Sequence, residues 1–207
     1  MLKILRNKIL SMWLCGVMVL VCVFSLSIRV DACGNFIVWE NHAKLIGGVG
    51  SYGDHVRYYW IHSSAAGETD IISQARYDWV NTTSVTTSLL IRQIGVQSSA
   101  VFDIHKEQQF PYESGVQGIA HFYNTSNSNM GTPTYDYKWT QIVLITRNYN
   151  EASQSQKLGI ISHEFGHCFG LAHTPNAANR IMYPYTNGRQ VTSPTTWDLL
   201  TINHLYG

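Results

Sequence analysis

The sequence of 207 residues is short of charges and of cysteines, and both shortages exclude classes of protein. Charged side chains make up only 13% of the chain and hydrophobic ones 45%, which excludes an intrinsically disordered protein. Two of the four cysteines, Cys15 and Cys22, lie in an apolar N-terminal segment, so there is no disulfide framework. The remaining pair, Cys33 and Cys168, fits a bacterial secreted enzyme better than an animal one.

The chain also lacks a basic block, an internal repeat and a low-complexity linker. Four of its 14 basic residues and one of its 13 acidic residues precede Cys33, which leaves ten basic and twelve acidic residues and a net charge of −2. Without a basic stripe, nucleic acid is not expected as a partner. The uniform composition predicts one domain over residues 33–207, which we expect to be a monomer.

The N-terminal segment is typical of an export signal. Three basic residues within the first eight precede an uncharged apolar run over residues 9–28. A small residue, Ala32, favours cleavage after it, so residues 1–32 are predicted to be a signal peptide and the protein to be secreted. Two alternatives stay open. The run of about 20 apolar residues is long enough for an uncleaved membrane anchor, and Cys33 is a poor match to a lipoprotein signal because Asp31 is unusual there.

Hydrophobic patterns along the rest of the chain predict an α+β or α/β domain. Strands are predicted over residues 56–64, 85–94, 99–107, 118–124 and 139–148, the last of them buried on both faces. Helices are predicted from Glu68 or Thr69, from near Gln156, and from Thr195 or Thr196. The spacing in the last helix predicts an apolar face of Trp197, Leu200, Ile202 and Leu205.

The segment HEFGHCFGLAH, residues 163–173, holds three histidines, one glutamate and two glycines. Residues four apart on a helix are separated by about 40° around its axis, so His163 and His167 project from one face. Two such imidazoles can bind one tetrahedral zinc ion, and a catalytic zinc needs a third protein ligand beside one open position. Gly170 permits a left-handed turn that ends the helix, so that His173 can return as the third ligand.

Glu164 is predicted to be a general base, because it lies about 60° from His167 and can take a proton from water beside the metal. A cluster of buried structural histidines is the alternative, but it does not explain five matching positions. A structural zinc would need a fourth ligand, which nothing nearby offers. Cys168, about 100° from His167, is expected to be buried and idle, with a disulfide to Cys33 as the alternative. The opposite face should anchor the helix on the sheet through Phe165, Phe169 and Leu171.

This segment resembles the signature of the metzincin zinc metalloproteases and is most similar to that of their matrixin branch. The resemblance implies an α+β, metzincin-type fold with a mixed, twisted sheet of about five strands, an active-site helix and a C-terminal helix. It also implies a secreted endopeptidase with one catalytic zinc bound by His163, His167 and His173, and with Glu164 as the catalytic base. A non-catalytic, membrane-anchored zinc-binding module is the alternative, although it would have no use for Glu164. A zinc hydrolase of non-protein amides is a third.

Three further segments carry the likeness. The segment IMYP, residues 181–184, resembles the matrixin Met-turn, which implies that Met182 lies beneath the zinc and that Pro184 walls the pocket for the side chain after the cleaved bond. The segment GIAHFYN, residues 118–124, resembles the edge strand that pairs with an extended polypeptide substrate, which implies that the Ala120 carbonyl lies near the site. The segment DLLTINHLYG at the C-terminus resembles the last helix of the family.

The sequence departs from the matrixin pattern where that family binds a second zinc and calcium. His121 and His105 are isolated candidate ligands, and Tyr135 and Tyr137 stand where an aspartate and a third histidine are expected. A second zinc is therefore not expected. Calcium (Ca2+) is possible but unsupported, because backbone carbonyls can bind it without a sequence signal. The residues around Cys33 also lack the flanks of an inhibitory propeptide cysteine.

Overall fold

The computed structural model describes residues 30–33, 36–50, 55–108 and 115–207. The apolar run over residues 9–28 lies outside these ranges. In the part that is described, no helix is both long and apolar enough to cross a membrane. The first described elements are two strands that the sequence pattern did not predict, β1 (Val30–Cys33) and β2 (Phe36–Trp39), which pair antiparallel. The expected cleavage point after Ala32 therefore falls within β1.

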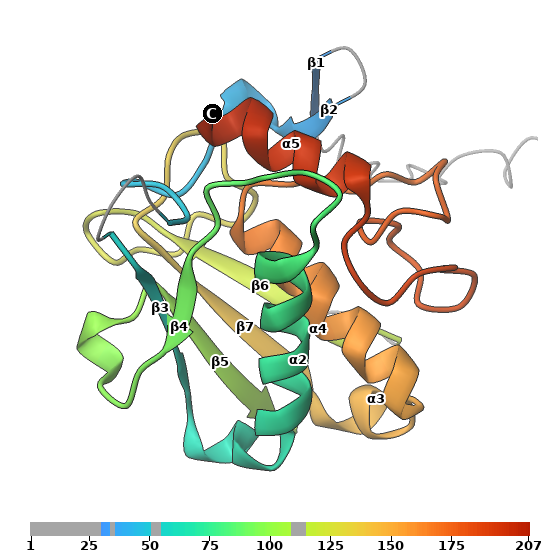
Figure 1. Cartoon of the computed structure of the whole chain (residues 1–207). Coiled ribbons are helices and arrows are strands. Elements are labelled where there is room, and N and C mark those ends of the chain that lie inside the picture. The colour runs from blue at the N-terminus through green and yellow to red at the C-terminus, as the bar shows by residue number, and fades with distance from the viewer. Residues whose placement is uncertain (1–29, 34–35, 51–54, 109–114) are drawn as a thin grey trace, which may run out of the picture.

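A mixed sheet of five strands forms the centre of the molecule, in the order β4-β3-β5-β7-β6 (Figure 1). Four of its strands are parallel, and β6 pairs antiparallel with β7 at the edge of the sheet. This arrangement confirms the predicted fold class. The strands are β3 (Arg57–Ile61), β4 (Ile91–Gln93), β5 (Phe102–Glu107), β6 (Gly118–Tyr123) and β7 (Trp139–Ile145).

All five strands are shorter than the sequence pattern predicts, and the reason is clear for β4 and β7. The apolar and β-branched run over residues 85–94 contributes only β4, because just three of its residues pair with β3. The run over residues 139–148 leaves the sheet after Ile145, where its buried apolar residues end. The polar residues that follow begin a short helix, α3 (Thr146–Asn150). Strand β7 is buried along most of its length, as predicted.

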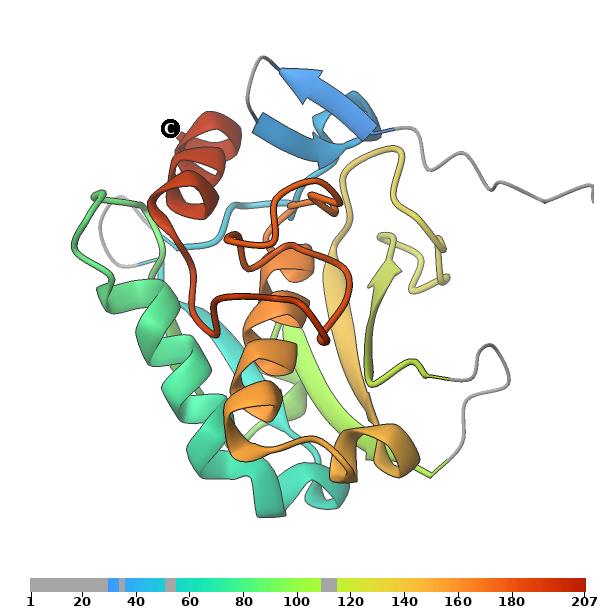
Figure 2. The ribbon, with the colours of Figure 1, turned by 90° about the vertical axis from the view of Figure 1, so that its right-hand side faces the viewer.

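Two helices pack on one face of this sheet, and a third lies at one end (Figures 1 and 2). Helix α2 (Thr69–Asn81) begins as predicted and buries residues spaced three and four apart. Helix α4 (Gln154–Cys168) begins two residues before the predicted Gln156, because Ser153 and Gln156 form a capping box at its N-terminus. Short 3₁₀ helices complete the elements: η1 (Glu40–His42), η2 (Ser63–Glu68) and η3 (Gln97–Ser99).

The C-terminal helix α5 (Thr196–Tyr206) is capped by Thr195, as predicted, but it buries a different face. Its buried apolar residues are Leu199, Ile202 and Leu205. Trp197 is 39% exposed, and its ring instead lies 5.0 Å from the guanidinium of Arg180. The predicted face was wrong at its first turn, because the periodicity did not distinguish Leu199 from its neighbours.

The apolar face of α4 faces the core, as its spacing predicts. The ring of Phe169 packs edge-on against Trp79 on α2 and Phe102 on β5, with centroid distances of 5.1 and 5.7 Å. The ring of Phe165 packs against Tyr59 on β3 in the same manner. This anchoring leaves the histidine-bearing side of α4 turned toward β6 and toward the loop that follows the helix.

Candidate metal centre

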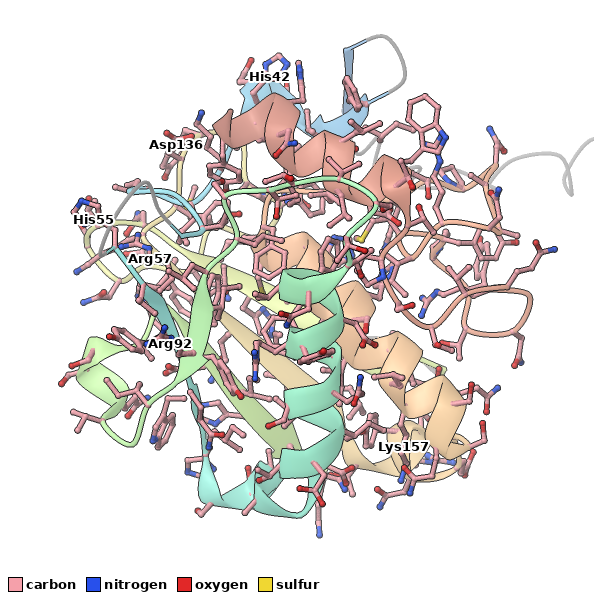
Figure 3. All side chains as sticks on the ribbon, in the orientation of Figure 1. His42, His55, Arg57, Arg92, Asp136 and Lys157 are labelled. Carbon is pink, nitrogen blue, oxygen red and sulfur yellow. The ribbon has the colours of Figure 1, made fainter. Side chains whose placement is uncertain are left out.

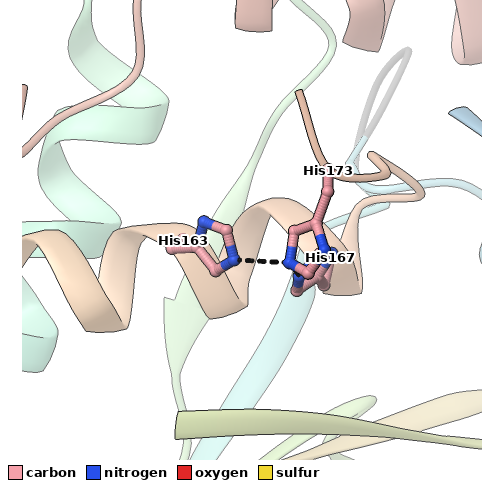
Figure 4. Close-up of side chains that lie close together, drawn as sticks. All are labelled: His163, His167 and His173. Atoms are coloured by element: carbon pink, nitrogen blue, oxygen red, sulfur yellow. Dashed lines mark hydrogen bonds between the residues drawn. The ribbon is translucent and has the colours of Figure 1, made fainter. Parts of the chain in front are cut away.

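Three histidines from α4 and the segment after it converge on one point (Figure 4). The Nε2 atom of His173 lies 3.1 Å from the Nε2 atom of His163 and 3.1 Å from that of His167. In a tetrahedral site with zinc–nitrogen bonds of roughly 2.0–2.1 Å, two ligand nitrogens are about 3.3 Å apart. The three rings therefore have the separation that one zinc ion requires. Among the described residues, no other group of three or more potential ligands meets this condition.

Hydrogen bonds at the other ring nitrogen determine which tautomer these histidines adopt. The Nδ1 atom of His163 lies 2.8 Å from the carbonyl oxygen of Ile181, and that of His167 lies 2.9 Å from the carbonyl oxygen of Leu171. A carbonyl only accepts, so each Nδ1 carries the hydrogen and each Nε2 presents a lone pair. The lone pairs of His163 and His167 can therefore be directed at one cation, beside the Nε2 atom of His173. The donor set thus fits zinc.

Burial keeps all three imidazoles neutral. It lowers the pKa of His163 and of His167 well below the ordinary value, and each pKa is lowered further by neighbouring histidines and by Arg189. Burial and the charge of Arg189 lower the pKa of His173 to about 4. Neutral imidazole is the form that binds metal, so the site is prepared for a cation at neutral pH.

The end of α4 determines where the third histidine lies. Gly170 has φ +98°, in the left-handed region that glycine adopts with little strain. The N–H of Leu171 donates to the Gly166 carbonyl, and the N–H of Gly170 donates to the His167 carbonyl, which together form a Schellman motif. The chain reverses at this point, as the sequence predicts, and it carries His173 back beside His163 and His167.

The N-terminal strand β2 supports the same segment from a distant part of the sequence. Val38 forms an antiparallel bridge with Leu171, and the N–H of Trp39 donates to the Gly170 carbonyl. The indole of Trp39 lies 5.2 Å from the ring of His167, and its Nε1–H donates to the carbonyl of that histidine. Sequence reasoning missed this contribution, because no local pattern links residues more than 120 positions apart.

The loop after His173 holds the predicted Met-turn against the helix. Met182 is buried, and its Sδ atom would lie only 2.2 Å from a Cβ atom placed on Gly166. Gly166, the first glycine of the motif, is therefore needed for Met182 to pack under α4. Asp198 accepts hydrogen bonds from the N–H of Ile181 and from Thr195, so the N-terminus of α5 fixes the residue whose carbonyl holds His163.

Glu164 lies beside the three histidines and is almost fully buried. Its Oε2 atom has no hydrogen-bond partner, and burial raises the pKa of the carboxyl to about 8, although the charge of Arg189 opposes this rise. Strand β6 approaches closely: a Cβ atom on Gly118 would lie 2.9 Å from Oε1 of Glu164. An unpaired buried carboxyl is costly, so its presence here indicates a chemical use.

A cleft of about 930 Å³ opens over these groups. Residues of strand β6 line one wall, and residues of the loop that follows α4 line the other. The predicted site residues Ala120 and Pro184 line opposite walls, and Trp39 and Arg189, which the sequence did not suggest, line it as well. Arg189 lies in a loop, outside any motif or periodic pattern, so nothing in the sequence indicated that it lines the cleft.

The other histidines and the cysteine of the motif lie outside the three-histidine group. His121 lines the cleft and lies 3.3 Å from the side-chain nitrogen of Asn129, and His105 stacks on His62. Cys168 is free and buried, and its burial raises its pKa, so the alternative of a disulfide with Cys33 is wrong. Figure 3 shows His42 and His55 at the periphery of the molecule, at a distance from α4.

A mixed five-stranded sheet, with a histidine-bearing helix above a methionine turn, defines a metzincin-type zincin domain. The family model described as matrixin matches residues 62–207, which is most of the chain. The chain therefore belongs to the matrixin family and is a metalloprotease-type hydrolase, as its motif predicted. Comparison with curated proteins finds no match.

Proposed function

We propose that this protein is a secreted, monomeric endopeptidase that uses one zinc ion and takes Glu164 as its general base. The observation that carries the proposal is the buried carboxyl of Glu164, unpaired beside three convergent histidine nitrogens in an open cleft. Metal ligands alone would suffice for a structural site. A carboxyl held without a partner next to them favours catalysis.

His163, His167 and His173 would hold the zinc ion, which when bound would supply Lewis acidity toward the scissile carbonyl and a water molecule. Glu164 would accept the proton of the attacking water at Oε2, which has no hydrogen-bond partner, and would transfer it to the amine that leaves. Burial raises the pKa of Glu164, and the charge of a bound zinc ion would favour the carboxylate form that a general base requires.

Strand β6 is proposed to bind the substrate as an additional strand. It pairs with β7 on one side and lines the cleft with the other. Near its end the Phe122 carbonyl accepts a hydrogen bond from the N–H of Met130, so the outer backbone groups closer to Gly118 are the ones proposed to pair with an extended polypeptide. Among the residues of this strand that line the cleft, Ala120 has a small side chain that leaves space for such a chain. A polypeptide substrate is favoured over a small amide for this reason, and no surface for nucleic acid is proposed.

The Glu164→Gln variant tests the proposal against a non-catalytic zinc-binding module. It should bind as much zinc as the wild type but lose at least about 100-fold in kcat on casein, because a general base contributes roughly 10²–10⁴. Zinc content is measured by mass spectrometry, and a chelator should abolish the wild-type activity. Wild-type turnover by the variant would refute the role of Glu164. Absence of proteolysis by the zinc-loaded wild type would favour the binding module.

A further inference from the structure

Arg189 is a partly buried cation in the wall of the cleft, and no described carboxylate forms an ion pair with it. The acid that interacts with it at longer range is Glu164, which lines the same cleft. Burial lowers the pKa of the Arg189 guanidinium only to about 10, so it is charged at neutral pH. Burying a charge without a partner is costly, and a substrate group can relieve this cost.

The guanidinium is held rigidly by backbone carbonyls. Its Nε–H and one Nη2–H donate to the carbonyl of Tyr183 at 3.1 and 2.8 Å, and its Nη1 donates to the carbonyl of Gly159 at 2.8 Å. An arginine has five N–H groups, so two remain for a ligand. Because the planar group is already oriented, little rotamer entropy is lost when a carboxylate binds to it.

The direction of β6 decides which part of a substrate meets this arginine. At the start of β6, Gly118 lies against Glu164 and against Ile160, which is one turn before the first metal ligand, whereas Phe122 near its end contacts Trp39 beside His167. A chain added antiparallel to β6 runs the opposite way. Its residues after the cut bond therefore pass over the N-terminal half of α4, where Gly159 binds Arg189.

We infer that Arg189 is a specificity-determining residue that binds a substrate carboxylate on the C-terminal side of the cut bond. The inference rests on the proposed endopeptidase function and adds a substrate class to it. The carboxylate comes either from an acidic side chain directly after the cut or from the free C-terminus of a short peptide. Both present two oxygens to the fork of the guanidinium.

Three matched fluorogenic peptides test the inference. The first has Glu after the cut and an amidated C-terminus, the second differs only by Gln at that position, and the third is the Gln peptide with a free C-terminus near the cut. Each is assayed with zinc-loaded wild type, Arg189→Gln and Arg189→Lys. The control is Arg92→Gln, since Arg92 is an exposed arginine on β4, at the opposite edge of the sheet from β6 (Figure 3).

The wild type should cleave one carboxylate peptide at least roughly tenfold faster in kcat/KM than the amidated Gln peptide, as a charge-assisted hydrogen bond predicts. This preference should weaken at high salt. Arg189→Gln should abolish it, Arg189→Lys should retain part of it, and Arg92→Gln should leave it unchanged. Preference for the Glu peptide identifies the side chain as the source, and preference for the free C-terminus identifies the terminal carboxylate.

Two results overturn the inference in distinguishable ways. Equal cleavage of all three peptides by the wild type refutes it and leaves the endopeptidase function intact. If the zinc-loaded wild type cleaves neither the three peptides nor casein, both the inference and the endopeptidase function are refuted. Arg189 also anchors two backbone carbonyls, so zinc content and circular dichroism are measured for each variant. If Arg189→Gln does not fold, the preference of the wild type, its salt dependence and the Arg189→Lys variant decide the question.

Discussion

Histidine rings lie close together in two places in this molecule, but their geometry differs between the two. On α4 and the segment after it, the rings of His167 and His163 are inclined at 83°, and three Nε2 atoms converge. At the ends of β3 and β5, His62 and His105 stack with a centroid distance of 4.6 Å and an angle of 9° between their rings. Both groups are at least partly shielded from water, but only the first can hold a metal.

The difference lies in where the ring nitrogens point. The lone pair of an imidazole nitrogen lies in its ring plane, so rings inclined by only 9°, as those of His62 and His105 are, direct their lone pairs along nearly parallel planes. On neighbouring parallel strands, aligned side chains favour stacking. At the metal centre, the ring of His167 crosses those of His163 and His173 at 83° and 64°. The rings of His163 and His173 are inclined by only 26°, yet the Nε2 atom of His173 lies 3.1 Å from that of each other histidine. A metal site therefore needs convergence, and proximity of histidines is insufficient.

The largest contrast is expected from removing one histidine of each group. His167→Ala removes one of three ligands and should abolish zinc binding and proteolysis together. His105→Ala, the matched control, removes a ring whose Nε2 is buried without a hydrogen-bond partner, and it should leave zinc content unchanged. Zinc content and casein hydrolysis are measured for both. Loss of zinc from the His105 variant would contradict the comparison.

A smaller effect is expected at the turn that makes the rings converge. Gly170→Ala places a Cβ atom 2.8 Å from Cδ1 of Leu205 at a residue with φ +98°, and it should destabilise the protein by about 1–3 kcal/mol. Gly67→Ala is the control, because its Cβ atom meets nothing within 4 Å and its φ is not positive. Urea unfolding measures both. Equal stability of the two variants would show that the turn does not require glycine.

The smallest effect is expected from mild acid. The pKa values of the α4 histidines are lowered, so these groups stay neutral as pH falls below the ordinary value of about 6.5, and that of His173 is about 4. Protons should therefore displace zinc only near or below about pH 4. Zinc retained after dialysis at about pH 7, 5 and 3.5 measures this. Release of most zinc between about pH 7 and 6 would show that the imidazoles are not shielded by burial.

The outcome of the sequence predictions follows the range of the interactions involved. The start of α2, the glycine turn at Gly170 and the apolar face of α4 were predictable, because each depends on residues within a few positions of one another. The strand over residues 85–94 and the first turn of α5 were predicted wrongly in part. In these two segments the sequence pattern shows which residues are apolar, but it does not show which of them another element will bury.

The sequence by itself determined the histidine spacing on α4, the glycine that reverses the chain and the resemblance to the matrixins. The tertiary structure decided the rest of the site. It brought the Ile181 carbonyl within hydrogen-bond distance of His163 and paired β2 with the segment after α4. It also brought Arg189 into the wall of the cleft. The physical reason is that helical geometry is set by neighbouring residues, whereas buried polar groups take their hydrogen-bond partners from whatever segments folding brings beside them.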